Sequence, residues 1–234
     1  MSPKNNNVGD AKKRIFDAAV ELFVEKGYSA VGVREIAREA GVNIAMINYY
    51  YGGKAGILKD ILEDASAKYY QAQATAGDNS TPPEVRVRNL VANVVRFFRE
   101  NTNEALIFFN STVYNIEEIK YGAEKWGRLY FELMGELFSQ MGVDLKDPVH
   151  ASIYNGYLGG MIKTHFQHRR DMERLTQKAT QDPEQEKAAG KLAFDDLFYQ
   201  KFVDLLVDQY FHGVFYATQN YRMKYSPTTK QNND

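Results

Sequence analysis

The sequence contains no cysteine, so disulfide bonds and thiolate metal sites are excluded. It also lacks any run of about 18 apolar residues, which excludes a predicted transmembrane helix. The first residues, MSPKNNNVGDAKK, carry no apolar core of the kind that a secretory signal needs. Together these absences predict a protein of the cytoplasm, where thiols stay reduced and disulfides are rare.

Excess charge of either sign is absent as well. The formal net charge of −1 argues against a broadly basic nucleic-acid-binding protein. The charge is nevertheless uneven, because residues 1–60 hold nine Lys or Arg and seven Asp or Glu, which leaves the remainder net negative. This asymmetry has the sign expected for DNA binding by the N-terminal part of the chain.

Strand-like alternation of apolar and polar residues is missing, and apolar residues recur instead at helical spacing. In the helix expected to begin at Asp10, for example, they follow the i, i+3, i+4, i+7, i+8 rule. We therefore predict an all-α fold. A charged, glutamine-rich stretch from Asp171 to Lys191 is expected to be a long connection, with or without a helical piece of its own. Besides two short helices between residues 33 and 51, the expected helices cover about 10–26, 54–76, 83–98, 104–114, 116–141, 147–170 and 194–221.

The two short helices are the most informative stretch. Ile36 and Ala40 lie on one face of the first helix, and Gly41 follows where a helix end often needs positive φ. Asn43 can cap a second helix over 44–51 through its side-chain oxygen. This spacing fits a helix-turn-helix, whose second helix enters the DNA major groove. It fits an ordinary helical hairpin inside a larger bundle equally well.

The residues around this stretch decide between the two, because they resemble the N-terminal DNA-binding domain of TetR-type transcriptional repressors. The matching positions are Ala18-Ala19, Leu22-Phe23, Lys26-Gly27-Tyr28, Val33, Ile36-Ala37, Ala40-Gly41-Val42, Tyr49 to Tyr51 and Lys54. The resemblance implies an N-terminal three-helix helix-turn-helix DNA-binding domain and a larger helical domain for effector binding and dimerisation. On this basis we divide the chain into a disordered tail (1–9), the DNA-binding domain (10–54), the helical body (55–225) and a second disordered tail (226–234).

The resemblance also implies which residues contact double-stranded operator DNA. The candidates are Arg34, Asn43, Ile44, Ala45, Met46, Asn48, Tyr49, Tyr50 and Lys54. Asparagine can read adenine through two hydrogen bonds, while Ile or Ala can contact a thymine methyl. Tyr49, Tyr50 and Lys54 are expected at phosphates, Lys54 together with the N-terminus of its helix.

Four positions depart from the family's usual residues. Gly32 stands where Thr often caps the first of the two helices. Asn48 stands where a phosphate-binding Tyr is common, and Ala45-Met46 replaces a frequent Gly-Thr pair. Tyr51 is expected in the core.

Members of the family bind DNA as dimers, which implies a homodimer formed here by the helices at about 148–170 and 194–221. Independently, Gly156, Gly159 and Gly160 weaken one of these helices, which is reasonable if they allow a second backbone to approach. A large monomeric core is the alternative.

The body is rich in aromatic residues, and similar proteins hold an apolar or aromatic effector there. We select Phe109, Trp126, Tyr130 and Tyr154 as candidates to line such a cavity. Aromatic residues at helical spacing are also expected in any helical core.

Catalytic and cofactor motifs are not found. His165 and His168 can share a helical face, but no third metal ligand is evident, so we predict no metal and no cofactor. The chain is predicted not to be an enzyme but a ligand-responsive DNA-binding transcriptional regulator. The favoured form is a repressor that a small, largely apolar or aromatic effector releases from its operator. A transcriptional activator of the same fold is the alternative, followed by a helical small-molecule-binding protein or enzyme.

Overall fold

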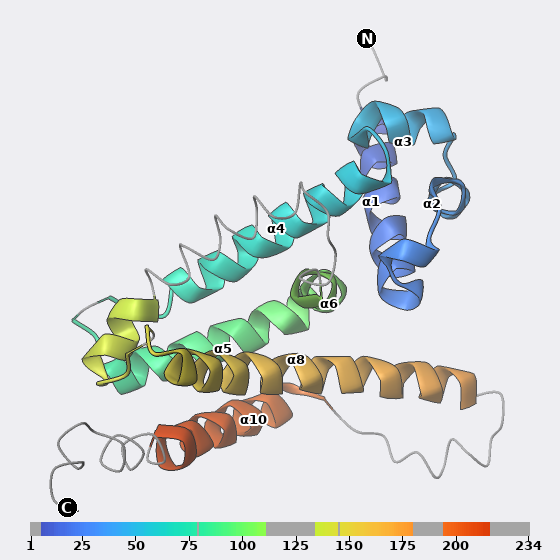
Figure 1. Cartoon of the computed structure of the whole chain (residues 1–234). Helices are drawn as coiled ribbons and strands as arrows, with labels where there is room; N and C mark the ends of the chain where they lie inside the picture. The colour runs from blue at the N-terminus through green and yellow to red at the C-terminus, as the bar shows by residue number, and fades with distance from the viewer. Residues whose placement is uncertain (1–5, 79, 111–133, 145, 180–193, 216–234) are drawn as a thin grey trace, which may run out of the picture. The chain divides into compact units, whose positions relative to one another are not determined.

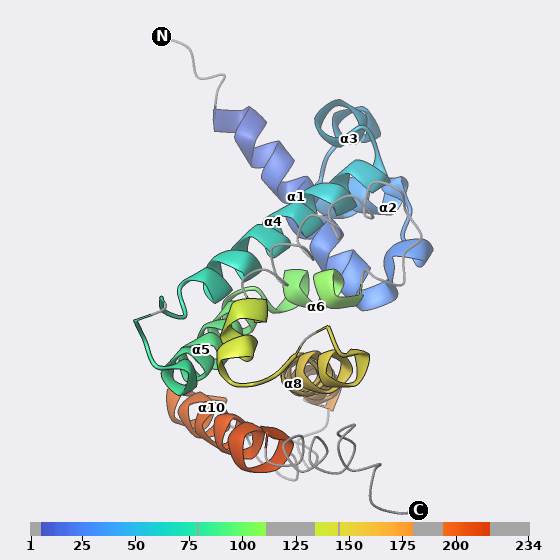
Figure 2. The same cartoon turned by 60° about the vertical axis from the view of Figure 1, so that its left-hand side comes forward.

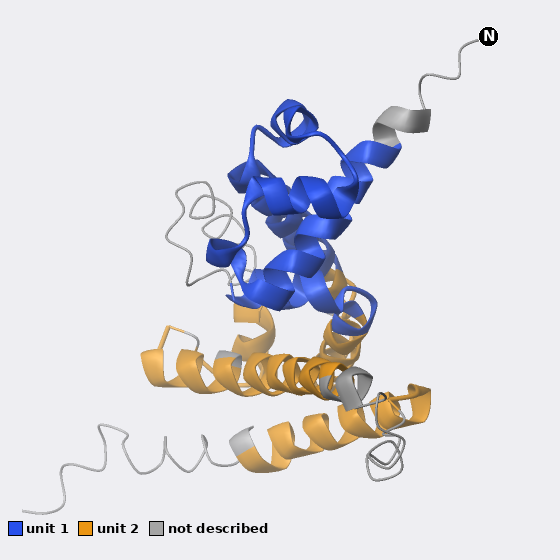
Figure 3. Cartoon of the chain, turned by 90° about the vertical axis from the view of Figure 1, so that its right-hand side faces the viewer, with its two compact units in different colours: residues 1–71, 97–129 blue, residues 72–96, 130–234 orange. Residues whose placement is uncertain are grey.

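The computed structural model describes residues 6–78, 80–110, 134–144, 146–179 and 194–215. The described residues form helices and their connections and contain no strand, so the predicted all-α fold is confirmed. The chain divides into two compact units, which Figure 3 distinguishes by colour. Unit 1 consists of Met1–Gln71 and Phe97–Leu129, and unit 2 of Ala72–Arg96 and Tyr130–Asp234.

Unit 1 holds the N-terminal helices labelled in Figure 1. They are α1 (Asn6–Lys26), the short 3-10 turn η1 (Tyr28–Ala30), α2 (Val33–Ala40), α3 (Ile44–Tyr51), most of α4 (Lys54–Ala74) and α6 (Thr102–Asn110). The α1 helix begins at Asn6 rather than Asp10, inside the segment that we expected to be disordered. The predicted boundaries of the other helices of unit 1 agree with the structure to within a few residues where it describes them.

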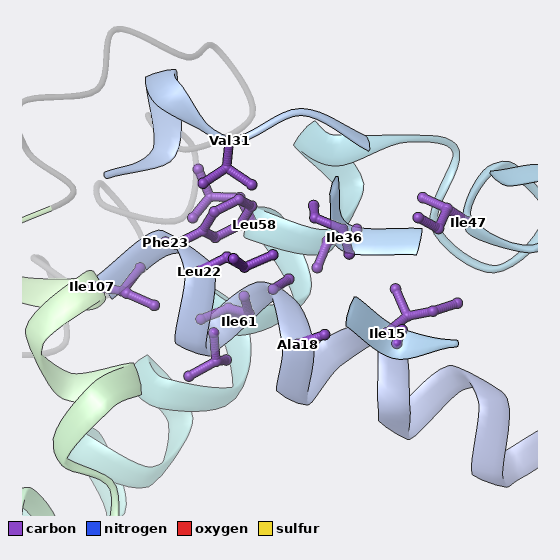
Figure 4. Close-up of a cluster of buried hydrophobic side chains, with 14 of the residues drawn as sticks. Ile15, Ala18, Leu22, Phe23, Val31, Ile36, Ile47, Leu58, Ile61 and Ile107 are labelled. Atoms are coloured by element: carbon purple, nitrogen blue, oxygen red, sulfur yellow. The ribbon is translucent and has the colours of Figure 1, made fainter. Parts of the chain in front are cut away.

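The apolar periodicity of α1 produces the core of this unit. Its buried positions include Ile15, Leu22 and Phe23, which share one face of the helix. Helices α2, α3, α4 and α6 each add apolar side chains to the same cluster (Figure 4). The contributed residues include Ile36, Ile47, Ile57, Leu58, Ile61 and Ile107. Since full burial of one such side chain stabilises by roughly 1.5–3 kcal/mol, this cluster holds the five helices together.

Unit 2 is built from most of α5 (Pro83–Glu100), the helical residues 134–140, α8 (Pro148–Ala179), α10 (Asp196–Gln209) and a π-helical segment, η3 (Tyr210–Phe215). Aspartates cap the helices α8 and α10. Asp147 Oδ1 accepts the backbone N–H of Val149 at 2.8 Å, and Asp195 Oδ1 accepts that of Phe198 at 2.8 Å.

The α8 helix is longer than the sequence indicated. We predicted a connection from Asp171, but residues 171–179 continue the helix to Ala179. Arg169 and Glu173 form an i, i+4 ion pair at 2.8 Å across the predicted end. No Gly or Pro occurs between Asp171 and Pro183, so nothing in that stretch breaks a helix.

Helices α8 and α10 lie side by side (Figure 1 and Figure 2). His165 of α8 contacts aromatic side chains of α10. Its ring centroid lies 4.6 Å from that of Phe202 and 5.4 Å from that of Phe198. Next to it, Arg169 Nη1 donates a hydrogen bond to the Tyr199 hydroxyl at 2.8 Å. An aromatic cluster with a polar border therefore joins the two helices.

None of the helices in the described residues is sufficiently long and apolar to cross a membrane.

The environment of His165 predicts how stability depends on pH. Burial, followed by the charges of Arg169 and His168, lowers the pKa of His165 below its usual 6.5. The unfolded chain then binds this proton more readily than the folded chain, so the associated stability is fully present above pH 6.5 and is lost as pH falls through the folded pKa. We expect thermal unfolding of His165→Phe to depend less on pH than that of the wild type between pH 7.5 and 5. Equal pH dependence of the two melting temperatures would contradict this.

Candidate nucleic-acid interface

The turn between α2 and α3 is made by a glycine that adopts a left-handed conformation. Gly41 has φ 62° and ψ 42°, which residues with a Cβ adopt at a cost. The backbone N–H of Val42 bonds to the carbonyl of Ala37 at 2.9 Å, which closes the end of α2. This local geometry fixes where α3 begins.

The start of each helix is capped differently. Gly32 precedes α2 in an extended conformation. It makes no side-chain cap, because glycine has no side-chain hydroxyl. Asn43 precedes α3, and its Oδ1 accepts the backbone N–H of Ala45 at 3.0 Å. This cap uses one of the two lone pairs of Oδ1, while the Nδ2 group stays free of the cap.

Ile47 is fully buried and determines which side of α3 faces solvent. Ile44 and Met46 are half-buried and pack against the core cluster. Ala45, Asn48 and Tyr49 are exposed together, because their spacing places them on the opposite side of the helix. Of the α3 residues predicted to contact DNA, these three therefore share the outward face.

The tyrosines that follow have separate roles. Tyr49 is 82% exposed and meets the Tyr50 ring edge-to-face at 5.0 Å. Tyr51 packs inward as predicted, and its hydroxyl donates a hydrogen bond to the Lys12 carbonyl at 2.8 Å, which ties α3 to α1. Burial, with smaller effects of two aspartates, raises the pKa of Tyr51 to about 12. Its hydroxyl therefore remains a donor at any physiological pH.

Lys54 is engaged inside unit 1. Its Nζ donates to the carbonyl oxygens of Tyr28 at 3.0 Å and Val31 at 2.9 Å, and it lies 4.1 Å from the centroid of the Tyr28 ring. An ammonium group has three N–H donors, so one remains for a phosphate. A phosphate contact by Lys54 stays a prediction, and stabilising the η1 turn is a role that the sequence did not reveal.

Most other cations of the domain have acidic neighbours. Lys12 pairs with Asp60 at 3.3 Å, Lys26 with Glu35 at 2.7 Å, and Lys13 with Asp17. Arg34, in the first turn of α2, is exposed and has neither an ion pair nor a side-chain hydrogen bond within the described parts of the chain. Its guanidinium is therefore available for a phosphate or a base edge.

Gly56 is a structural residue of this region that sequence analysis missed. A Cβ at this position in α4 would lie 1.7 Å from the carbonyl oxygen of Tyr51. The close approach of the α4 backbone to the end of α3 thus requires glycine here. The signal in the sequence is a glycine in the first turn of a helix, where it lowers helix propensity without any local need.

The predicted ligand-binding residues are distributed over both units. Phe109 of unit 1 is half-buried, and its ring lies 5.1 Å from that of Tyr69 and 5.2 Å from that of Phe98. Tyr154 of unit 2 is buried beside Phe138. Trp126 and Tyr130 lie outside the described residues.

The structure gives no support for a metal site at His165 and His168. Within the described ranges, no group of three or more His, Asp or Glu side chains is arranged to hold a metal ion. His165 is instead surrounded by aromatic rings.

Comparison with known proteins agrees with this geometry. Residues 15–61 match the family model described as bacterial regulatory proteins, tetR family. The N-terminal domain belongs to the TetR family. A probable helix-turn-helix transcriptional regulator of Bacillus subtilis, YttP, is 41% identical over 68 residues, which are 29% of this chain and 33% of that protein. The transcriptional repressor NicS of Pseudomonas putida is 31% identical over 87 residues, 37% of this chain and 41% of that protein.

The matches thus span well under half the length of these two curated relatives, while the likeness to solved structures extends further. The fatty acid degradation regulator FadR from Bacillus halodurans aligns with 91% of this chain and 97% of its own at a TM-score of 0.61 and 16% identity. The TetR family regulator PfmR from Thermus thermophilus aligns with 64% of this chain and 85% of its own, at a TM-score of 0.56 and 23% identity. These similarities support a TetR-like fold beyond the first domain. These relatives are transcriptional regulators, which agrees with the prediction that the chain is not an enzyme.

The space around Gly56 generates a stability prediction. Gly56→Ala should lower the free energy of unfolding by about 3 kcal/mol or more, because its Cβ clashes with backbone rather than with a flexible side chain. Gly135→Ala, in the helical residues 134–140, is the matched control, since a Cβ there meets nothing within 4 Å. That variant should be neutral or stabilised by up to about 1 kcal/mol through helix propensity. Chemical denaturation measures both, and a Gly56→Ala variant as stable as its control would refute the close approach.

Proposed function

We propose that this chain is a cytoplasmic DNA-binding transcriptional regulator, and that it acts as a repressor released from its operator by a small effector. The observation that carries the proposal is the outward face of α3. Ala45, Asn48 and Tyr49 are exposed on a short helix whose other side is anchored in the core. A helix held this way, in a domain of the TetR family, has the form of a recognition helix.

The chemistry of this face favours contact with A·T base pairs. Asn48 is the residue on it whose side-chain amide can both donate to and accept from adenine, and the Ala45 methyl can meet a thymine methyl. Tyr49, with a nearly fully exposed side chain, reaches a phosphate with its hydroxyl, and Arg34 supplies a positive charge at the start of α2.

We further propose that the regulator is a homodimer formed through α8 and α10. Exposed apolar side chains on these helices support this, namely Val149, Ile153, Met161, Leu197 and Leu205. Gly156 and Gly160 share a face of α8 with Ile153. Apart from their chain neighbours and the adjacent backbone of α8, no atom of the described residues lies within 4 Å of where their Cβ atoms would be. Glycines that the chain's own packing does not require fit a surface that a second backbone approaches.

The proposed effector would act by binding one conformation of the dimer more tightly than another. If the favoured conformation places the two recognition helices wrongly for adjacent major grooves, operator affinity falls by the ratio of the two effector affinities. The aromatic side chains around Phe109 and Tyr154 are the candidates for this binding.

Binding to the DNA that flanks the protein's own gene tests the proposal, measured at 50 and 200 mM salt. Tight, sequence-selective binding that weakens steeply with salt is the expected result. Affinity no better than for random DNA, on these and on other genomic fragments, would contradict it.

Two substitutions separate base reading from phosphate binding. Asn48→Ala should weaken operator binding by about tenfold or more and relax selectivity at one base pair, whereas Arg34→Ala should weaken binding to every sequence and reduce the salt slope by about one. The control is Arg99→Ala, since Arg99 is an exposed arginine in the last turn of α5. This substitution should change neither the selectivity nor the salt dependence of binding. Fluorescence anisotropy with operator and single-base variants measures all three. Unchanged selectivity in Asn48→Ala would exclude the assigned role.

The dimer proposal has its own test by sedimentation. Ile153→Glu places a charge in the proposed interface and should shift the protein from dimer to monomer while lowering operator affinity. Val85→Glu is the matched control, because Val85 is also an exposed aliphatic residue but lies on α5. Sedimentation of Ile153→Glu as a dimer with unchanged affinity would show that the interface lies elsewhere.

A further inference from the structure

His150 is a buried polar side chain that the proposed DNA contacts and dimer surface do not use. It lies in the first turn of α8 and is 2% exposed. Neither ring nitrogen, Nδ1 nor Nε2, has a hydrogen-bond partner within the described parts of the chain. A neutral imidazole carries one donor and one acceptor, and leaving both unmade in the interior costs folding free energy. Such a group in a native protein calls for an explanation in function.

The surroundings of His150 are aromatic. Its ring meets that of Tyr154 nearly at right angles, with 6.3 Å between the centroids. The Tyr154 ring in turn lies 5.6 Å from Phe138 and 5.5 Å from Tyr210. All four residues belong to unit 2 and are almost completely buried. We call them the His150 cluster, in which the imidazole is a polar end to a set of aromatic rings.

A second observation points to the same place. The π-helical segment η3 begins at Tyr210, a member of the cluster. The π-helix is rare, and where it interrupts a helix it is often found at a functional site. This irregularity of the backbone is independent of the hydrogen-bonding state of His150.

We propose that the His150 cluster binds an uncharged phenol, whose hydroxyl forms hydrogen bonds with the His150 ring. A hydroxyl both donates and accepts, as does a neutral imidazole. The phenol ring can meet the aromatic side chains edge-to-face, the arrangement that aromatic pairs prefer. A charged ligand is disfavoured, because burying an ion in an apolar core is costly and the His150 cluster contains no Asp, Glu, Lys or Arg to pair with it. This inference rests on the proposed function only in assigning the phenol as the effector.

Calorimetry with the full chain tests the site through three probes that differ in one group. They are p-cresol, p-xylene, in which a methyl replaces the hydroxyl, and 4-methylbenzoate, which is charged. We expect p-cresol to bind at least about tenfold more tightly than either of the others, since only its hydroxyl matches the imidazole. Equal binding of p-cresol and p-xylene, or no binding of p-cresol at millimolar concentration, would overturn the site without any need for a variant.

Substitution of the histidine gives a second test. His150→Leu removes both unpaired nitrogens at similar volume, so the variant should melt at the same or a higher temperature and lose its preference for p-cresol over p-xylene. His168→Leu, the same change at an exposed histidine of α8, should keep that preference. Retained preference in His150→Leu would overturn the assignment.

The effector role is separated by measuring DNA binding with and without p-cresol. A lowered operator affinity in the wild type but not in His150→Leu supports it. Binding of p-cresol with unchanged operator affinity would support the site and overturn only its regulatory role. Absence of operator binding in the apoprotein would instead contradict the proposed function and leave the site intact.

Discussion

The burial of Ile47 is the constraint on which the DNA-binding face depends. With this side chain at 0% exposure in the core that α1, α2, α4 and α6 also build, α3 has a single rotational setting about its axis. Asn43 and Gly41 then determine where the helix starts, and the Tyr51 hydroxyl attaches its end to α1. Short helices are marginal alone, so this packing rather than helix propensity holds the recognition surface in place.

Several cations of unit 1 form hydrogen bonds that stabilise the fold. Arg14 Nη1 donates to the carbonyl of Ala40 at the end of α2 at 3.1 Å, and Lys54 donates to two carbonyls around η1. Both satisfy acceptors that helix ends leave open. These hydrogen bonds make the domain more rigid. Its net positive charge is small, because acidic residues nearly balance its basic ones. Electrostatic, sequence-independent binding should be correspondingly modest, and contacts made by α3 should supply a larger share of the affinity.

Much of unit 1 was predictable because its signals are local. The apolar spacing of α1, the glycine after α2 and the asparagine before α3 each act within a few residues. The bonds of Lys54 to carbonyls of η1 and the contact of Gly56 with Tyr51 were not predictable, since they arise only when separate helices meet. The length of α8 was missed for another reason: its charged, weakly periodic end is stabilised by an ion pair along the helix rather than by an apolar face. His150 gave no sequence signal, because a lone histidine in an apolar helix is ordinary.

The proposed function requires that α3 enters the major groove of DNA. The most direct measurement is methylation interference on DNA that the protein selects from a random library, because guanine N7 lies in the major groove and adenine N3 in the minor groove. We predict interference at guanine N7 beside A·T pairs, in two half-sites spaced by whole helical turns. Interference confined to adenine N3, or none at all on selected DNA, would contradict the central role of α3.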